Sequence, residues 1–253
     1  MTIAPSRKTA VGRDAGGDQA SFRRWAFIIG VGIFATLLSE PQVLDLPFRN
    51  LLKDDLGISE QGMAVFFALG AFPWYFKIVA GLLSDSIPLF GTRRRHYLIL
   101  SATFASALWA ALAYLPRSYT SVLFLTLAIN TMLVIGSTVV GGFLVEAGQR
   151  LGAAGGLASI RIFVENACVL LGGPLAGILA GLPFGFAAAV GAAVALAAAP
   201  VTLFLLKEPV RATYDASVLS SAYRGLQILF RSGLMWIVAV LLFFAICTGS
   251  LSP

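Results

Sequence analysis

Long runs of uncharged, mostly apolar residues are the feature that most restricts how this chain can fold. Six such runs lie at residues 25–39, 61–76, 97–115, 118–145, 166–206 and 232–253. A membrane-spanning helix needs about 20 predominantly apolar residues. Only 12% of the 253 residues are charged, whereas soluble domains carry about 25% charged residues. The sequence therefore predicts an all-α polytopic membrane protein and excludes a soluble globular domain.

The runs also predict the number and the limits of the membrane helices. The fifth run is too long for one crossing, and the turn-forming sequence GLPFGF at 181–186 divides it. We therefore expect seven helices, at about 25–44, 60–83, 97–115, 121–146, 157–179, 184–206 and 233–253.

Two segments outside these helices have a different composition. Residues 1–24 mix small residues with both signs of charge and lack the apolar core of a signal peptide, so we expect a disordered cytoplasmic tail. The linker 207–232 has apolar residues at helical spacing beside arginines. This spacing predicts an amphipathic helix on the cytoplasmic membrane surface.

The distribution of Lys and Arg predicts the orientation of the chain. Thirteen of the 18 cations fall in the tail and in the loops on one side, and three fall on the other side. The positive-inside rule then places the N-terminus in the cytoplasm and, after seven crossings, the C-terminus outside. We expect a plasma or inner membrane, with an organelle membrane as the alternative. Because the cations lie beside apolar runs, we expect a lipid bilayer and no nucleic acid as the partner.

The sequence lacks the side-chain combinations on which most enzymes depend. It has one histidine, His96, and two cysteines, Cys168 and Cys247, which lie inside apolar runs. A cysteine in such a run usually behaves as a small apolar residue. We therefore expect no enzymatic activity, no cofactor, no metal site and no disulfide.

Two ionisable residues in or near the apolar segments are candidates for contact with a solute. Fifteen residues separate Arg24 from Glu40, about 22 Å of helix. This distance places Glu40 at the outer boundary or in a wet cavity; the alternative is an interfacial carboxylate at a helix broken by Pro41. Lys77 lies about two turns before the end of the second predicted helix. It either faces a central cavity or extends its ammonium group to the lipid headgroups.

Polar residues in the fourth and fifth predicted helices complete the candidate set. We assign Asn130 and Ser137 to the substrate-binding group with Glu40 and Lys77, although amide and hydroxyl groups in membrane helices also join neighbouring helices. Arg161 and Glu165 are four residues apart, so we expect a structural ion pair.

The loop after the second predicted helix carries the most specific motif. Its characteristic residues are Gly81, Asp85, Gly91, Arg93, Arg94 and Arg95. A carboxylate and guanidinium groups at one helix junction can hold one conformation of a moving bundle by charge-assisted hydrogen bonds. We therefore predict a conformational latch at the cytoplasmic surface. The motif resembles the signature loop between the second and third helices of the major facilitator superfamily.

Further landmarks narrow this resemblance. The sequence has the run LKDDLGIS at 52–59, the pair Pro73-Trp74, then Lys77, and Tyr97-Leu98 after the arginine cluster. This order of landmarks resembles the folate-biopterin transporter family. The resemblance implies movement of a pterin, a folate or another organic anion by alternating access.

The chain departs from the family pattern in its fourth predicted helix. The family carries two aspartates, four residues apart, ahead of a Val-Glu pair. Alignment on Val145-Glu146 places Ser137 and Gly141 at those positions.

The resemblance also sets an expectation for the domains. Superfamily members have twelve helices in two halves, with the solute site between the halves. We expect residues 25–206 to form an N-terminal six-helix bundle and residues 233–253 to form the first helix of a C-terminal half. Such a bundle would pair with a second copy or with a separately encoded C-terminal half. The alternative function is a non-transporting membrane helper or assembly protein, or an inactive fragment of a split or truncated transporter gene.

Overall fold

A computed structural model describes residues 8–41, 43–92, 94–116, 118–206, 224, 227, 228, 231–238, 240 and 241. Every regular element within this part is helical, which confirms the predicted all-α class for the described residues. Six helical stretches are long and apolar enough to cross a membrane. They are Gln19–Leu38, Glu60–Ser86, Arg95–Tyr114, Tyr119–Leu151, Ala154–Ala180 and Phe184–Leu205.

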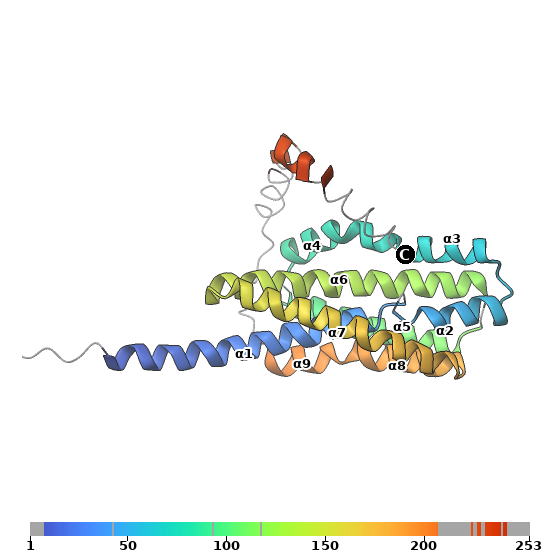
Figure 1. The fold of residues 1–253 in the computed structure, drawn as a ribbon, viewed down its shortest axis with the longest axis horizontal. Coiled ribbons are helices and arrows are strands. Elements are labelled where there is room, and N and C mark those ends of the chain that lie inside the picture. The colour runs from blue at the N-terminus through green and yellow to red at the C-terminus, as the bar shows by residue number, and fades with distance from the viewer. Residues whose placement is uncertain are drawn as a thin grey trace, which may run out of the picture.

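The helices form one bundle around α6 (Figure 1). In chain order they are α1 (Lys8–Leu38), α2 (Asp45–Asn50), α3 (Glu60–Gly70), α4 (Lys77–Ser86), α5 (Arg95–Tyr114), α6 (Tyr119–Leu151), α7 (Ala154–Ala180), α8 (Phe184–Leu196) and α9 (Ala198–Leu205). A π-helical segment (Leu51–Asp55) follows α2, and a 3-10 segment (Phe72–Phe76) joins α3 to α4. In Figure 1, α3 and α4 lie along one side of α6, and α8 and α9 lie on the opposite side of the bundle.

Three of the predicted helices are interrupted, each next to a proline. Helix α1 ends before Pro41, because the residue before a proline is disfavoured in the α conformation. Pro73 lies in the 3-10 segment that separates α3 from α4. Helix α8 ends at Leu196, whose carbonyl would otherwise bond to the N–H that Pro200 lacks. Each of these crossings was predicted as one continuous helix, with a break at Pro41 as the alternative for the first.

The N-terminal segment also differs from the prediction. Helix α1 begins at Lys8, within the segment 1–24 that was expected to form a disordered tail. These residues contain no proline, and extending an existing helix is much easier than starting a new one. The expected linker helix (207–232) and seventh crossing (233–253) lie mostly outside the described residues, although residues 233–238 are helical.

A fully buried tryptophan fixes the end of α1. The Nε1–H of Trp109 in α5 donates a hydrogen bond to the Ser39 carbonyl oxygen at 3.0 Å. The Phe48 ring packs edge-on against Trp109, with 5.8 Å between ring centroids. A Cβ atom at Gly191 would lie 2.6 Å from the same ring, so only glycine lets α8 approach this closely. The packing sets the backbone position of the residue after Ser39, which is Glu40.

Two arginines hold the C-terminal end of α9. Arg24 of α1 donates from Nε to the Leu205 carbonyl oxygen at 3.0 Å, and Arg95 of α5 donates from Nη2 to the Leu203 carbonyl oxygen at 2.7 Å. The last carbonyl groups of a helix lack partners within the helix and carry partial negative charge. These contacts therefore fasten α1, α5 and α9 together at one end of the bundle.

Candidate functional site

A cavity of about 190 Å³ lies between α1, α4, α6 and α7. We call it the Glu40 cavity. Its charged and hydrogen-bonding lining residues are Thr36, Glu40, Trp74, Lys77, Ser137, Arg161 and Glu165. Three of the four residues predicted to contact a solute, Glu40, Lys77 and Ser137, thus meet in one place.

The helix interruptions position two sides of this cavity. Glu40 lies in the turn after α1, next to Pro41. Trp74 lies in the 3-10 segment after Pro73, and Lys77 is the first residue of α4. Irregular backbone at membrane depth is tolerated where it lines a cavity, and broken helices commonly form solute sites in transporters.

Lys77 points its ammonium group toward the other lining residues. Its Nζ donates a hydrogen bond to Ser137 Oγ at 3.0 Å. The same nitrogen lies 5.1 Å from the centroid of the Trp74 ring, within the range of a cation–π interaction. These contacts favour the cavity interpretation of Lys77 over the extension toward lipid headgroups.

Arg161 and Glu165 form an ion pair, with 2.7 Å between Arg161 Nε and Glu165 Oε1. Both side chains also line the Glu40 cavity, which the sequence analysis did not predict. The cavity therefore holds two cations, Lys77 and Arg161, and two carboxylates, Glu40 and Glu165. With all four residues ionised, these charges balance.

Glu40 lies two residues beyond the first candidate span, which ends at Leu38. Burial raises the pKa of Glu40 from its ordinary value of 4.5 to about 7, and the nearby Lys77 ammonium opposes this effect. A desolvated carboxylate holds its proton more tightly because burial disfavours the charged form. The charge of the cavity therefore changes near neutral pH.

Asn130 lies outside the Glu40 cavity, contrary to its assignment to the substrate-binding group. Its fully buried side chain donates from Nδ2 to the Gly70 carbonyl oxygen at 2.7 Å. This bond joins α6 to the last residue of α3. Amides in membrane helices often join neighbouring helices in this way, and the residue spacing alone did not indicate which face of α6 Asn130 occupies.

Ser137 and Gly141, the positions at which the resemblance predicts aspartates, both line the Glu40 cavity. Residues four apart lie on the same face of a helix. Both positions that lack the expected aspartates therefore lie on the same face of α6. A Cβ atom at Gly141 would meet no neighbouring atom within 4 Å. The cavity therefore has room for a side chain that this sequence lacks.

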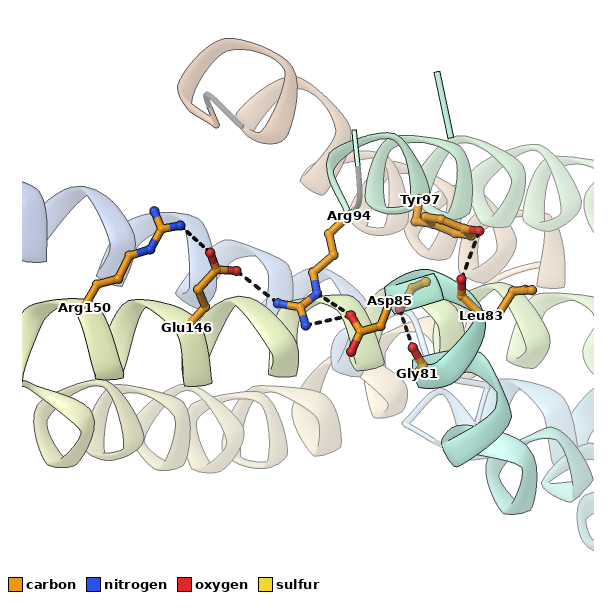
Figure 2. A network of polar contacts seen from close by, with 8 residues as sticks. Gly81, Leu83, Asp85, Arg94, Tyr97, Glu146 and Arg150 are labelled. Carbon is orange, nitrogen blue, oxygen red and sulfur yellow. Dashed lines mark hydrogen bonds and ion pairs between the residues drawn. The ribbon is translucent and has the colours of Figure 1, made fainter. Parts of the chain in front are cut away.

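A second polar cluster lies where α4, α5 and α6 meet (Figure 2). Arg94 donates to Asp85 Oδ1 from Nε at 2.9 Å and places Nη2 2.7 Å from the same oxygen. Its Nη1 lies 3.2 Å from Glu146 Oε2, and Arg150 Nη2 lies 2.6 Å from Glu146 Oε1. We call Asp85, Arg94, Glu146 and Arg150 the Arg94 network. The Arg94 side chain is only 11% exposed, so its contacts with two carboxylates matter more than an exposed pair would.

Glycines shape the surroundings of this network. A Cβ atom at Gly142 would lie 2.7 Å from Arg94 Cζ, so glycine lets the guanidinium group lie against α6. Gly91 has a φ of +79°, a left-handed conformation that favours glycine in the loop before Arg94. Gly81 lets α4 approach α6, since its Cβ would lie 3.2 Å from Thr138 Cγ2.

The predicted latch and the observed network overlap only in part. Asp85 and Arg94 are paired, whereas Arg95 donates to the end of α9 and Arg93 lies outside the described residues. Glu146 and Gly142 were not among the residues predicted for the latch. Their spacing could have indicated a shared role, because two residues four apart lie on one face of α6. The sequence does not show, however, that this face packs against Arg94.

Comparisons with known proteins identify a family and several relatives. Residues 41–237 match the BT1 family. The chain is 42% identical over 111 residues to the "Folate-biopterin transporter" of Synechocystis sp., covering 43% of this chain and 22% of that protein. It is 29% identical over 131 residues to "Probable folate-biopterin transporter 4" of Arabidopsis thaliana, covering 50% and 27%. It is 30% identical over 74 residues to "Folate transporter 1" of Plasmodium falciparum, covering 29% and 15%.

These alignments reach only part of each relative. The largest covered share is 27% of the relative's length, so the chain matches about a quarter of the longer proteins. No solved structure matches the chain.

Proposed function

Because this chain belongs to the BT1 family, we propose that it takes part in moving a pterin, a folate or a related organic anion across a membrane by alternating access. The names of three relatives and six candidate membrane spans support this proposal. The Glu40 cavity is the observation on which the proposal depends most.

The chemistry of the cavity suits a polar organic solute. Within the described part of the chain, the ammonium group of Lys77 donates one side-chain hydrogen bond, to a neutral hydroxyl, Ser137 Oγ. An ammonium group has three donors, so donors remain for a solute. A cation away from the lipid headgroups is costly unless it has a partner or a function. We therefore assign Lys77 to solute contact, with Ser137 orienting its side chain.

The Arg94 network supplies a contact that a change of conformation can break and remake. It joins three helices at one end of the bundle through a buried guanidinium group. Asp85→Asn would remove the negative charge that strengthens both Arg94 contacts to this side chain; a hydrogen bond to a charged group contributes about 1.5–3 kcal/mol. The variant should still insert into membranes but should alter the labelling of cysteines introduced near that end. Unchanged labelling together with lost expression would make the network a folding element only.

Binding and uptake test the transport proposal directly. The purified chain should bind radiolabelled biopterin or folate saturably. Proteoliposomes should accumulate the label when the chain is paired with a second copy or with a C-terminal half, because alternating access needs two bundles. Lys77→Met should weaken binding by about tenfold or more, equivalent to about 1.4 kcal/mol. Lys53→Met is a matched control, because Lys53 is exposed and pairs with Glu60 at 3.3 Å, away from the cavity. No binding by the unmodified chain, or equal loss in both variants, would contradict the proposal.

One observation favours a second candidate, a non-transporting membrane protein of the same family. The two positions where the resemblance predicts aspartates carry Ser137 and Gly141, and both face the cavity. A chain of this kind would bind the solute without accumulating it. Gly141→Asp then provides the test, since the site has room for a side chain. Uptake that appears only in this variant would support the second candidate, and uptake by the unmodified chain would exclude it.

A further inference from the structure

We propose, on the basis of the proposed function, that the Glu40 cavity binds the bicyclic heterocycle of the solute and recognises its 2-amino-4-oxopyrimidine edge. The Glu40 carboxylate accepts hydrogen bonds from the exocyclic 2-amino group and from the adjacent ring N–H. Lys77 and the Trp74 indole donate to the oxo group and the ring nitrogens. Any carboxylate tail of the solute lies outside the cavity.

The charge balance of the cavity is the first argument. Above pH 7 Glu40 is ionised, and Lys77 and Arg161 are then opposed by Glu40 and Glu165. Under these conditions a charged carboxylate that entered would leave an uncompensated negative charge. Burying an unpaired charge is far more costly than burying a neutral polar group that is hydrogen-bonded. A neutral, donor-rich heterocycle therefore fits this cavity better than the acidic end of a folate does.

The unused hydrogen-bonding capacity is the second argument. Arg161 and Glu165 engage each other at 2.7 Å. In contrast, the Glu40 carboxylate makes no hydrogen bond with the described part of the chain, and the buried Trp74 Nε1–H has no partner there. Apart from the Arg161–Glu165 pair and the hydroxyl groups, the cavity thus presents one carboxylate acceptor, Glu40, and two N–H donors, Lys77 and Trp74. A carboxylate accepts well from an amino group, as Glu and Asp do from the N4 amino group of cytosine. Its second oxygen can accept from an adjacent ring N–H.

The size of the cavity is the third argument. Its volume is about 190 Å³, whereas pockets for drug-sized ligands measure about 300–1,000 Å³. The cavity therefore accommodates one bicyclic ring system rather than a complete folate. Glu40 and Trp74, which each lie beside a proline-induced interruption, then become the residues that determine specificity for the ring.

The experiment compares three probes: biopterin, the lumazine that corresponds to it (the same side chain, with an oxo group in place of the 2-amino group) and p-aminobenzoylglutamate (which lacks the heterocycle). The purified full chain should bind biopterin at least about tenfold more tightly than lumazine, as expected for one well-placed pair of hydrogen bonds. Glu40→Gln should abolish that preference, so that the two compounds bind with about equal affinity. Glu60→Gln should preserve it, because Glu60 is exposed and pairs with Lys53. p-Aminobenzoylglutamate should bind weakly, and its affinity should be equal in all three proteins.

A second variant tests the inference independently in case Glu40→Gln does not fold. Trp74→Phe keeps a ring but removes the N–H donor, so biopterin binding should weaken several-fold while the protein elutes unchanged from a sizing column. An unmodified chain that binds neither biopterin nor folate would overturn the proposed function and this inference together. An unmodified chain that binds biopterin and lumazine equally, or a Glu40→Gln variant that keeps the preference, would overturn the inference alone.

Discussion

Glu40 shows how the burial of one side chain makes the bundle sensitive to pH. Its carboxylate lines a cavity beside Lys77, Arg161 and Glu165, while α6 contributes the uncharged Ser137. Burial raises its pKa from 4.5 to about 7. Between these two values the folded chain holds a proton that the unfolded chain releases. Stability contributed by this residue therefore decreases as pH rises through that window.

We predict that the melting temperature of the chain in mild detergent falls between pH 5 and pH 8 and that Glu40→Gln largely removes this fall. The neutral amide no longer requires ionisation of a buried group. A change of 1 kcal/mol shifts the melting temperature of a chain of this size by about 2–4 °C. Scanning fluorimetry at several pH values measures the slope, and Glu60→Gln is the control. An unchanged slope in Glu40→Gln would show that another group causes the pH dependence.

Gly142 is a second residue whose importance comes from its surroundings. We predict that Gly142→Ala displaces the Arg94 guanidinium group, because the new Cβ would lie 2.7 Å from Arg94 Cζ. The measurement is the maleimide labelling rate of Leu37→Cys, a position in the Glu40 cavity, after both native cysteines are replaced by serine. The rate should rise several-fold as the contact of about 1.5–3 kcal/mol weakens.

Gly141→Ala is the matched control for this experiment. Its Cβ would meet no atom within 4 Å, so the labelling rate should stay close to that of the parent protein. Equal rates in all three proteins would mean that the Arg94 contacts do not restrict access to the cavity.

For individual residues, the sequence identified charged candidates for the site. It did not show on which face of a helix a side chain lies. Glu40 and Lys77 were identifiable because an ionisable group is rare in an apolar segment. Asn130 was assigned to the cavity but bonds to Gly70, since an amide serves a solute and a neighbouring helix equally well. Gly142 was not singled out, because its effect depends on which side chain from another helix lies against it.

The helices were largely predictable from hydropathy, and their interruptions were not. The apolar runs predicted the five crossings after α1 to within a few residues at their ends. The breaks depend on single prolines, and a proline in a membrane helix is often tolerated when neighbouring groups satisfy the freed carbonyl. Here Pro41 and Pro73 mark breaks that place Glu40, Trp74 and Lys77 at the cavity.

Close packing between α5 and α8 gives a test at the scale of the element. We predict that Gly191→Ala destabilises the bundle by about 1–3 kcal/mol, the usual cost of overpacking. The new Cβ would lie 2.6 Å from the rigid Trp109 ring. Gly185→Ala in the same helix meets no atom within 4 Å and should have little effect. Thermal unfolding in detergent compares the two, and equal melting temperatures would show that α5 and α8 separate at no cost.

The whole molecule has two chemically different ends. At one end Arg24 and Arg95 reach the last turn of α9, and the Arg94 network lies next to Arg95 in the chain. At the other end Asn50 donates to the Ala180 carbonyl oxygen at 3.2 Å and joins the region of α2 to the end of α7. Arg49 and Lys53 are the cations of that second end among the described residues. The asymmetry of charge predicted from the loops is therefore present in the folded bundle.

We predict that the Arg94 end faces the cytoplasm, because membrane proteins retain an excess of Lys and Arg on that side. Reporter fusions should read inside after residues 92 and 212 and outside after residues 117 and 183. The inside reading after 212 requires six crossings before that point, in agreement with the six candidate spans, and the outside reading after 117 requires three. A fully inverted pattern would keep the fold but reverse its orientation, which would place the Arg94 network at the outer surface. A mixed pattern would show that one of the six helices does not cross, and α1 with its early end before Pro41 would then be the first helix to examine.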